Sequence, residues 1–157
     1  MAMQFKNVLF PTDFSALSVH ALTHAASLVE TFESQLHCIY VVDDANFYWT
    51  AFGPEAVPLG PPVDELVTQA RLRMERFAGE HLRAFQPPPV TDVRVGRPFA
   101  EIIAYAREKQ VDLIVMGTHG RGAIAHALLG STTEKVVRKA PCAVLTVRSP
   151  DHQFSPP

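Results

Sequence analysis

Three glycines and a serine at fixed spacing are the residues of this sequence best suited to chemistry. They are Gly117, Gly120, Gly130 and Ser131, in the pattern Gly-x2-Gly-x9-Gly-Ser. Glycine lets the backbone turn sharply and lets its N–H groups approach a ligand closely. Ser131 and Thr132 add hydroxyl donors at the start of a predicted helix, where backbone N–H groups attract anions. The segment is therefore predicted to bind phosphate groups.

Other side chains in this segment are suited to holding a phosphate. Ser131 and Glu134 have the spacing of a capping box, which would open a helix at residues 131–139. Arg121 provides a positive charge within the loop, and His119 can donate a hydrogen bond to a phosphate. The alternative interpretation is that His119 is an ordinary loop residue and that the glycines only make turns.

Two common phosphate-binding motifs do not fit the segment. A Walker A loop has a lysine directly after its last glycine, and this position is Ser131. The dinucleotide fingerprint is loosely matched at residues 120–125, but it requires a further strand ending in an acidic residue about 20 positions on. The chain has Ala140 and Pro141 at that distance, before its last predicted strand begins.

The elements that must position this segment alternate between apolar runs and amphipathic stretches. Continuous apolar runs predict buried strands, and apolar residues at helical spacing predict helices. Asp13 or Ser15 is expected to cap the first helix, and Pro87–Pro89 to end the second. Strands are expected at 7–12, 35–42, 90–95, 111–116 and 143–147, and helices at 15–30, 62–85, 98–109 and 131–139.

This alternation predicts an α/β domain with a parallel sheet and helices on both faces. In such sheets a ligand binds beyond the carboxyl ends of the strands, at the point where the strand order reverses. Three segments are therefore expected to form the site: residues 11–15, 41–44 and 117–131. The domain is expected to span residues 1–148, and residues 149–157 are expected to form a disordered tail.

The composition is that of an ordinary globular protein. The 157 residues are 47% hydrophobic and 19% charged, with a formal net charge of −2. This charge gives no overall attraction to nucleic acid or to an anionic membrane. No apolar stretch approaches membrane-spanning length, and the first six residues lack the apolar segment of a signal peptide, so a cytoplasmic location is expected. Cys38 and Cys142 lie in apolar runs and are expected to pack in the core.

The segment 43–61 is unusually long for a connection in a compact domain. It contains the aromatic residues Phe47, Tyr48, Trp49 and Phe52. The alternatives are a lid over the site, a surface for an unknown protein partner, or a mobile insertion.

Taken together, these motifs resemble the universal stress protein family in its ATP-binding branch. The match runs from KNVLFPTDFS through VDLIVMGTHGRG to LLGSTTEKVVRKAPCAVLTVR. The resemblance implies a Rossmann-like five-stranded parallel sheet of order 3-2-1-4-5, in a homodimer that binds ATP. AMP or ADP are alternative ligands, and Mg²⁺ can accompany the phosphates. The family's nucleotide contacts map onto Asp13, Val41, Met116, Gly117, Gly120, Gly130, Ser131 and Thr132.

The residue types agree with this assignment. Val41 and Met116 are apolar side chains at strand ends and can sandwich a purine. The Asp13 carboxylate can accept from ribose hydroxyls or face a metal ion on the phosphates, and it can also cap a helix. Pro11 shapes the turn before it, and Thr12 completes the Pro-Thr-Asp sequence, so both are counted among the binding residues.

The remaining candidates are weaker. His20 and His24 have a spacing compatible with a metal site, but a solvated helix face is expected. Arg97 precedes the third helix near the same edge of the sheet and can contact a phosphate. No catalytic set is assembled, because Ser131 has no base beside it and no carboxylate pair is placed to position a water molecule.

The sequence thus predicts an ATP-binding stress-response protein that acts as a homodimer. Residues 143–147 form an apolar last strand, expected at the sheet edge, where it can pair with its copy. A slow ATPase or phosphotransferase is one alternative. A partner-binding module with an unused nucleotide site is another.

Overall fold

Strands and helices alternate along the chain, as the apolar pattern predicts. The structure is a computed structural model that describes residues 4–44, 60–119 and 129–150. The elements in these ranges are β1 (Asn7–Pro11), α1 (Ala16–Phe32), β2 (Gln35–Asp43), α2 (Val63–His81), β3 (Val90–Gly96), α3 (Pro98–Glu108), β4 (Leu113–Gly117), α4 (Ser131–Lys139) and β5 (Ala143–Val147).

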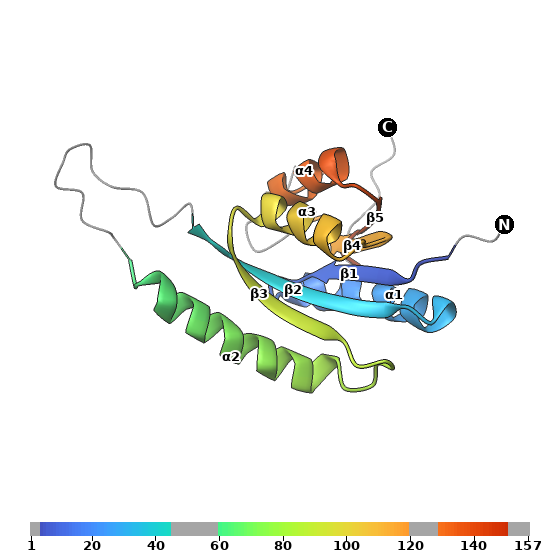
Figure 1. Cartoon of the computed structure of the whole chain (residues 1–157), viewed down its shortest axis with the longest axis horizontal. Helices are drawn as coiled ribbons and strands as arrows, with labels where there is room; N and C mark the ends of the chain where they lie inside the picture. Colours follow the sequence, from blue (N-terminus) through green and yellow to red (C-terminus); the bar gives the residue numbers. More distant parts are fainter. Residues whose placement is uncertain (1–3, 45–59, 120–128, 151–157) are drawn as a thin grey trace.

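The five strands form one parallel sheet in the order β3-β2-β1-β4-β5 (Figure 1). This confirms the predicted order. The central strand, β1, pairs with β2 on one side and with β4 on the other, so that Val8 lies opposite both Leu36 and Leu113. Because all neighbouring strands are parallel, their carboxyl ends lie at the same edge of the sheet.

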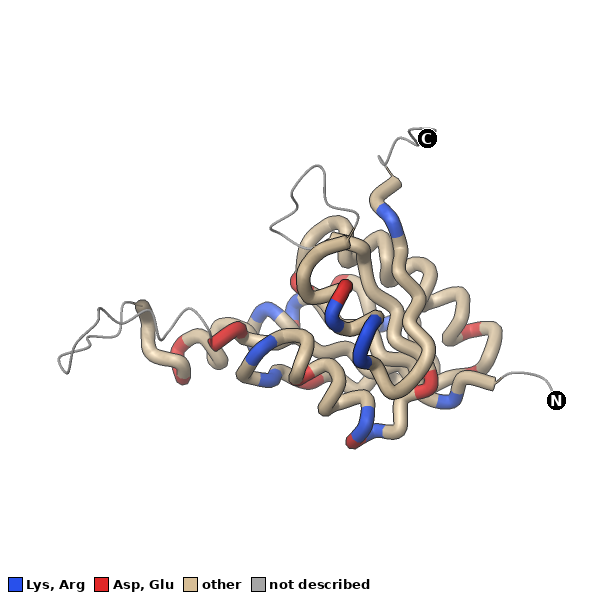
Figure 2. Tube along the Cα trace, turned by 90° about the horizontal axis from the view of Figure 1, so that it is seen from above, with Lys and Arg blue, Asp and Glu red and all other residues tan. Residues whose placement is uncertain are grey.

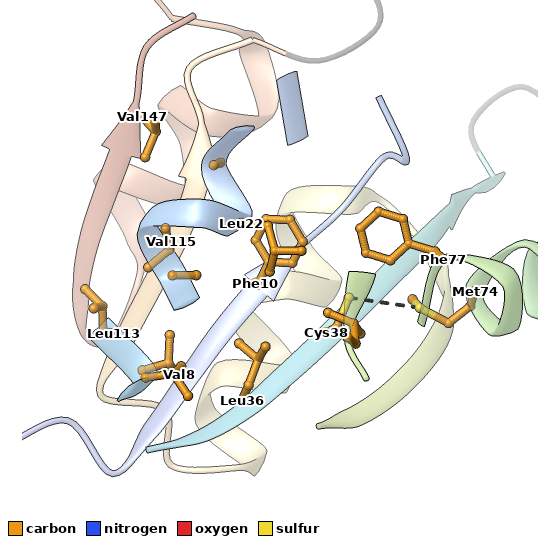
Figure 3. Close-up of a cluster of buried hydrophobic side chains, with 14 residues drawn as sticks. Val8, Phe10, Leu22, Leu36, Cys38, Met74, Phe77, Leu113, Val115 and Val147 are labelled. Carbon is orange, nitrogen blue, oxygen red and sulfur yellow. Dashed lines mark hydrogen bonds between the residues drawn. The ribbon is translucent and has the colours of Figure 1, made fainter. Parts of the chain in front are cut away.

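Helices cover both faces of the sheet. On one face, Phe10 of β1 and Cys38 of β2 pack against α1 and against Met74 and Phe77 of α2 (Figure 3). Cys38 Sγ lies 4.0 Å from Met74 Sδ, so this cysteine packs in the core as predicted. On the other face, alternate strand residues pack against α3 and α4; they are Leu9, Ile39, Ile114 and Met116. Cys142 is half-buried beside this second cluster.

Most element boundaries agree with the sequence prediction within one residue, but α1 ends two residues later than expected, and the contacts explain larger differences in α2 and β4. Helix α2 ends at His81 rather than Phe85, because the chain leaves the helix at Leu82 to bury that side chain against the sheet. Strand β4 begins at Leu113 rather than Val111. The side chain of Asp112 instead accepts hydrogen bonds from the N–H groups of Lys6 and Asn7, at 2.8 and 2.9 Å, and so ties the start of β4 to the start of β1.

The charged side chains are distributed over the surface. Figure 2 shows lysine and arginine interspersed with aspartate and glutamate along the described chain, in keeping with the small net charge. Within the described residues, no helix has the length and apolar character needed to cross a membrane.

A buried polar cluster lies at the amino end of the sheet, away from the strand ends predicted to form the site. His37 of β2 is only 6% exposed, and its Nδ1 lies 3.0 Å from the Tyr105 hydroxyl. Its Nε2 lies 3.4 Å from Asn7 Oδ1, and Asn7 Nδ2 donates to the carbonyl of Gln110. Burial raises the pKa of Tyr105 to about 12, so the hydroxyl keeps its proton and can donate to Nδ1. The cluster therefore suits a neutral imidazole.

This cluster predicts a loss of stability in mild acid. Burial, together with the positive charge of Lys109, lowers the pKa of His37 in the folded chain below its ordinary value of 6.5. The stabilisation from neutral His37 is therefore complete above pH 6.5 and is lost as the pH falls toward the folded pKa. We expect the free energy of unfolding, measured by urea titration, to fall between pH 7 and pH 5 more steeply for the wild type than for His37→Gln. Equal slopes for the wild type and His37→Gln would contradict the prediction.

Candidate functional site

A pocket of about 630 Å³ lies at the carboxyl end of the sheet. Its walls come from the ends of β1, β2 and β4 and from the first turns of α3 and α4. This is the edge at which the strand order reverses, where the alternation of elements predicts a ligand. The lining residues on the strand and turn side are Pro11, Thr12, Asp13, Ser18, Ile39, Tyr40, Val41, Asp43, Met116, Gly117 and His119. Those on the helix side are Pro98, Ile102, Leu129, Gly130, Ser131, Thr132, Thr133 and Glu134.

The structure brings the sequence-predicted site residues together in this pocket. The predicted residues that line it are Pro11, Thr12, Asp13, Val41, Met116, Gly117, His119, Gly130, Ser131 and Thr132. Gly120 and Arg121 lie outside the described residues, as do the aromatic residues of the 43–61 segment. Arg97 is the exposed N-cap of α3 and is not part of the described lining.

The N-terminus of α4 opens onto the pocket. Gly130 is the N-cap, and the next three residues, which are the first of the helix, line the pocket. The predicted capping box between Ser131 and Glu134 is wrong, because the N-cap is Gly130, which has no side chain, and no side chain of the described residues caps this helix. The helix begins one residue earlier than the motif requires, so that Glu134 N–H donates to the Gly130 carbonyl at 2.9 Å. The first-turn N–H groups, which a capping side chain would otherwise engage, therefore remain available to an anion.

Two hydrogen bonds fix the start of α4 against the end of β4, and a third ties the residue after β4 to β5. The buried Thr133 hydroxyl donates to the Gly117 carbonyl at 2.9 Å. Gly130 N–H donates to the Thr118 carbonyl at 2.7 Å, and Thr118 N–H donates to the Val147 carbonyl at 2.9 Å. The anion-attracting helix end is thus tied to two strands, and its position in the pocket is set by the sheet.

The turn between β1 and α1 forms another wall. The hydroxyl oxygens of Thr12 and Ser18 lie 2.7 Å apart, and Thr12 Oγ1 also accepts from the N–H of Phe14. Asp13 Oδ1 accepts from Ser15 N–H at 2.9 Å. Ser15, rather than Asp13, is the N-cap of α1, because its hydroxyl oxygen accepts from Ser18 N–H. Asp13 is therefore held by the turn beside the pocket instead of capping the helix.

An apolar wall faces α3. Val41 and Met116 both belong to the cluster on that face of the sheet, together with Ile39 and Ile102. The sequence interpretation missed Ile39, and it included Asp43 in a site segment without naming it as a binding residue. Both follow from the alternation of side chains along a strand, since residues two positions from Val41 share its face. It also missed Pro98 and Ile102, whose place depends on how α3 is rotated against the sheet.

The dimensions suit a ligand with an apolar end and an anionic end. The apolar wall includes the end of β2, whereas the α4 N-terminus follows β4, and β1 lies between these strands. Two strand spacings of about 4.8 Å separate β2 from β4, or about 10 Å in all. A ligand that contacts both Val41 and Ser131 must therefore span the end of β1, where Asp13 lines the pocket.

One protein-family model matches nearly the whole sequence. The Universal stress protein family model matches residues 4–148. The chain belongs to the universal stress protein family. Universal stress protein MJ0531 of Methanocaldococcus jannaschii is 32% identical over 146 residues, which cover 93% of this chain and 84% of the relative. A universal stress protein of Methanothermobacter thermautotrophicus is 35% identical over 152 residues, covering 95% of this chain and 99% of that one.

Solved structures of the family share the fold. The structure of MJ0577 of Methanocaldococcus jannaschii superimposes with a TM-score of 0.77 at 28% identity, covering 96% of this chain and all of that one. Universal stress protein UspA of Lactobacillus plantarum superimposes with a TM-score of 0.74 at 27% identity, covering 94% of this chain and 100% of that one. The Rossmann-like order of the five strands is thus the order of the universal stress protein fold.

The histidine pair on α1 stands apart from the pocket. The rings of His20 and His24 meet edge to face, with centroids 5.3 Å apart. In the ranges that the structure describes, no three histidine, cysteine or acidic side chains are grouped to hold a metal ion.

The bond between Thr133 and Gly117 predicts a specific effect of mutation. Thr133→Val keeps the shape of the side chain but leaves the Gly117 carbonyl without its hydroxyl donor. We expect unfolding in urea to show a loss of about 1–2 kcal/mol. Thr31→Val is the control, because Thr31 donates to a helix carbonyl on the exposed face of α1. It should change stability by less than about 0.5 kcal/mol. Equal effects of the two substitutions would show that the buried bond does not hold α4.

Proposed function

We propose that this chain binds an adenine nucleotide, with ATP as the first candidate, and that it acts as a stress-response regulatory protein in the cytoplasm. The observation that carries the proposal is the pocket itself. One side is an apolar wall at the end of β2, and the other is the N-terminus of α4, with the end of β1 between them. A nucleotide combines these two chemistries in one ligand.

In the proposed complex the base packs against Val41 and Met116, on the face covered by α3. The ribose lies beside Asp13, whose carboxylate accepts from its hydroxyls. The phosphates lie at Gly130, Ser131 and Thr132, where backbone N–H groups and two hydroxyls can donate. The proposed phosphate contacts also include His119, Gly120 and Arg121. The glycine spacing of the ATP-binding branch of the family supports this arrangement.

A divalent cation would enter with the nucleotide. Asp13, Asp43 and Glu134 all line the pocket, but within the described residues no three such groups are placed to hold a metal. The ligands of a Mg²⁺ ion would therefore be phosphate oxygens and water molecules, with one or two of these carboxylates at most, as is usual for this ion.

We further propose that the chain forms a homodimer through β5. This strand is at one edge of the sheet, where its outer backbone groups are available for pairing. Two large apolar side chains are exposed on the elements beside this edge: Leu145 on β5, at 37%, and Val137 on α4, at 45%. A copy of the chain that pairs along β5 would cover both.

The nucleotide proposal predicts a thermal shift. At a ligand concentration about 100-fold above Kd, binding stabilises the folded state by about 2.7 kcal/mol. For a domain of this size, this corresponds to a rise in Tm on the order of 5–10 °C. Differential scanning fluorimetry with millimolar ATP and Mg²⁺ measures it. An unchanged melting curve would refute the proposal, and mass spectrometry of any copurifying small molecule provides an independent test.

A glycine substitution tests whether the ATP-induced rise in Tm arises from this pocket. Gly130 has φ −66° and ψ 154°, which alanine also adopts. Gly130→Ala should therefore fold but place a methyl group where the pocket approaches the phosphates, and the ATP-induced shift should be lost. Gly79→Ala, in α2 and away from the pocket, is the matched control. The added methyl there meets only the end of the Arg83 side chain, at 3.7 Å, so the shift should be retained.

The dimer proposal predicts that a charge at the β5 edge separates the subunits. Leu145→Glu should sediment as a monomer at micromolar concentration, whereas the wild type should sediment as a dimer. Leu72→Glu is the control, because Leu72 on α2 is more exposed, at 59%, yet lies away from β5. A wild type that sediments only as a monomer would contradict the proposal.

A further inference from the structure

We propose that Phe14 is a positioning residue for the pocket. Its aromatic ring, held on the far face of the sheet, fixes the turn at residues 12–15 and so sets the place of the Asp13 carboxylate. Phe14 does not line the pocket itself. The consequence for ligand affinity rests on the proposed nucleotide binding, whereas the consequence for the turn can be tested without a ligand.

The backbone of Phe14 adopts a conformation that its residue type disfavours. Its φ is +63°, in the left-handed region that glycine enters readily and most side chains avoid. Such a conformation persists only where surrounding contacts determine it. The contacts that hold Phe14 must therefore stabilise this turn by more free energy than the unfavourable φ costs.

Both peptide groups that flank the Cα atom of Phe14 are tied to pocket residues. The N–H of Phe14 donates to Thr12 Oγ1 at 3.0 Å, and the N–H of Ser15 donates to Asp13 Oδ1 at 2.9 Å. A rotation about the backbone bonds of Phe14 would move one or both N–H groups and break these bonds. The orientation of the Asp13 side chain is thus coupled to the backbone of its neighbour.

The ring of Phe14 is held from three sides. It stacks on Tyr40 with ring centroids 4.6 Å apart, and its contact with Phe77 of α2 is edge to face at 5.5 Å. The guanidinium carbon of Arg73, also on α2, lies 4.8 Å from the ring centroid. Phe77 in turn stacks on Phe10 inside the buried cluster shown in Figure 3. The ring is therefore anchored in the core that α2 forms with the sheet.

This anchoring links two walls of the pocket. Tyr40 packs with the α2 side of the sheet, and the next residue, Val41, packs on the α3 side as part of the apolar wall. One stack of rings thus fixes the backbone that carries Val41 and the turn that carries Asp13. Phe14 can therefore affect the affinity for a ligand without touching it.

The test separates the ring from the backbone conformation. Phe14→Ala removes the ring and keeps the unfavourable φ, whereas Phe14→Gly removes the ring and makes that φ favourable. If the ring positions the turn, both variants should bind ATP about 10-fold more weakly than the wild type, in calorimetry well below the Tm. Wild-type affinity in Phe14→Gly would overturn the inference, because the conformation alone would then be sufficient.

A matched control excludes a general loss of stability. Phe5 is also half-buried against the same core cluster and packs edge to face on Phe32, at 5.0 Å. Phe5 precedes β1 and so lies at the amino end of the sheet, whereas the pocket lies at the carboxyl end. Phe5→Ala should lower the Tm and leave the Kd for ATP unchanged. An equal loss of affinity in Phe5→Ala would assign the effect to stability and overturn the positioning role.

A second readout needs no nucleotide. The Ser15 amide should exchange its hydrogen faster in Phe14→Ala and Phe14→Gly than in the wild type or Phe5→Ala, because its bond to Asp13 opens more often. Unchanged protection at Ser15 would overturn the inference. A wild type that binds no adenine nucleotide would refute the proposed function, and the exchange measurement would then decide the role of Phe14 alone.

Discussion

The parallel pairing of β1 with both β2 and β4 is the constraint on which the rest of the structure depends. It places the ends of three strands side by side, with β1 in the centre. As a result, Asp13, Val41 and Ser131 line one pocket although they are far apart in the sequence. The hydrophobic layers on the two faces of the sheet hold this pairing in place.

Short hydroxyl side chains convert this general arrangement into a defined site. Thr12 and Ser18 fix the turn after β1, and Thr133 fixes the start of α4. All three are buried, and each has a hydrogen-bond partner. Among the described residues, no buried side-chain polar atom lacks a partner. This complete pairing matters because a buried hydroxyl without a partner would destabilise the very segments that line the pocket.

Much of the fold could be predicted from the sequence, because its signals are local. The apolar run of β4 and the helical spacing of α1 identify their elements directly, whereas the strand order came from the resemblance to the family. The three segments at the strand ends followed from the topology, whereas the individual contacts, such as Val41 and Met116, came from the resemblance. What was missed depends on details in three dimensions: the rotation of α3 brings Ile102 to the pocket, and a shift of one residue at Gly130 removes the capping box. Phe14 is held by Tyr40, which lies on β2, and the sequence spacing gives no sign of this contact.

The hydrogen bond from Gly130 to Thr118 has a consequence for how members of such a family can diverge. It closes the chain on itself, so that the segment between these two residues starts and ends at fixed points. The free energy needed to close a loop rises only slowly with its length. A change of length between these two points would therefore cost little free energy by itself and would leave the start of α4 where the sheet holds it.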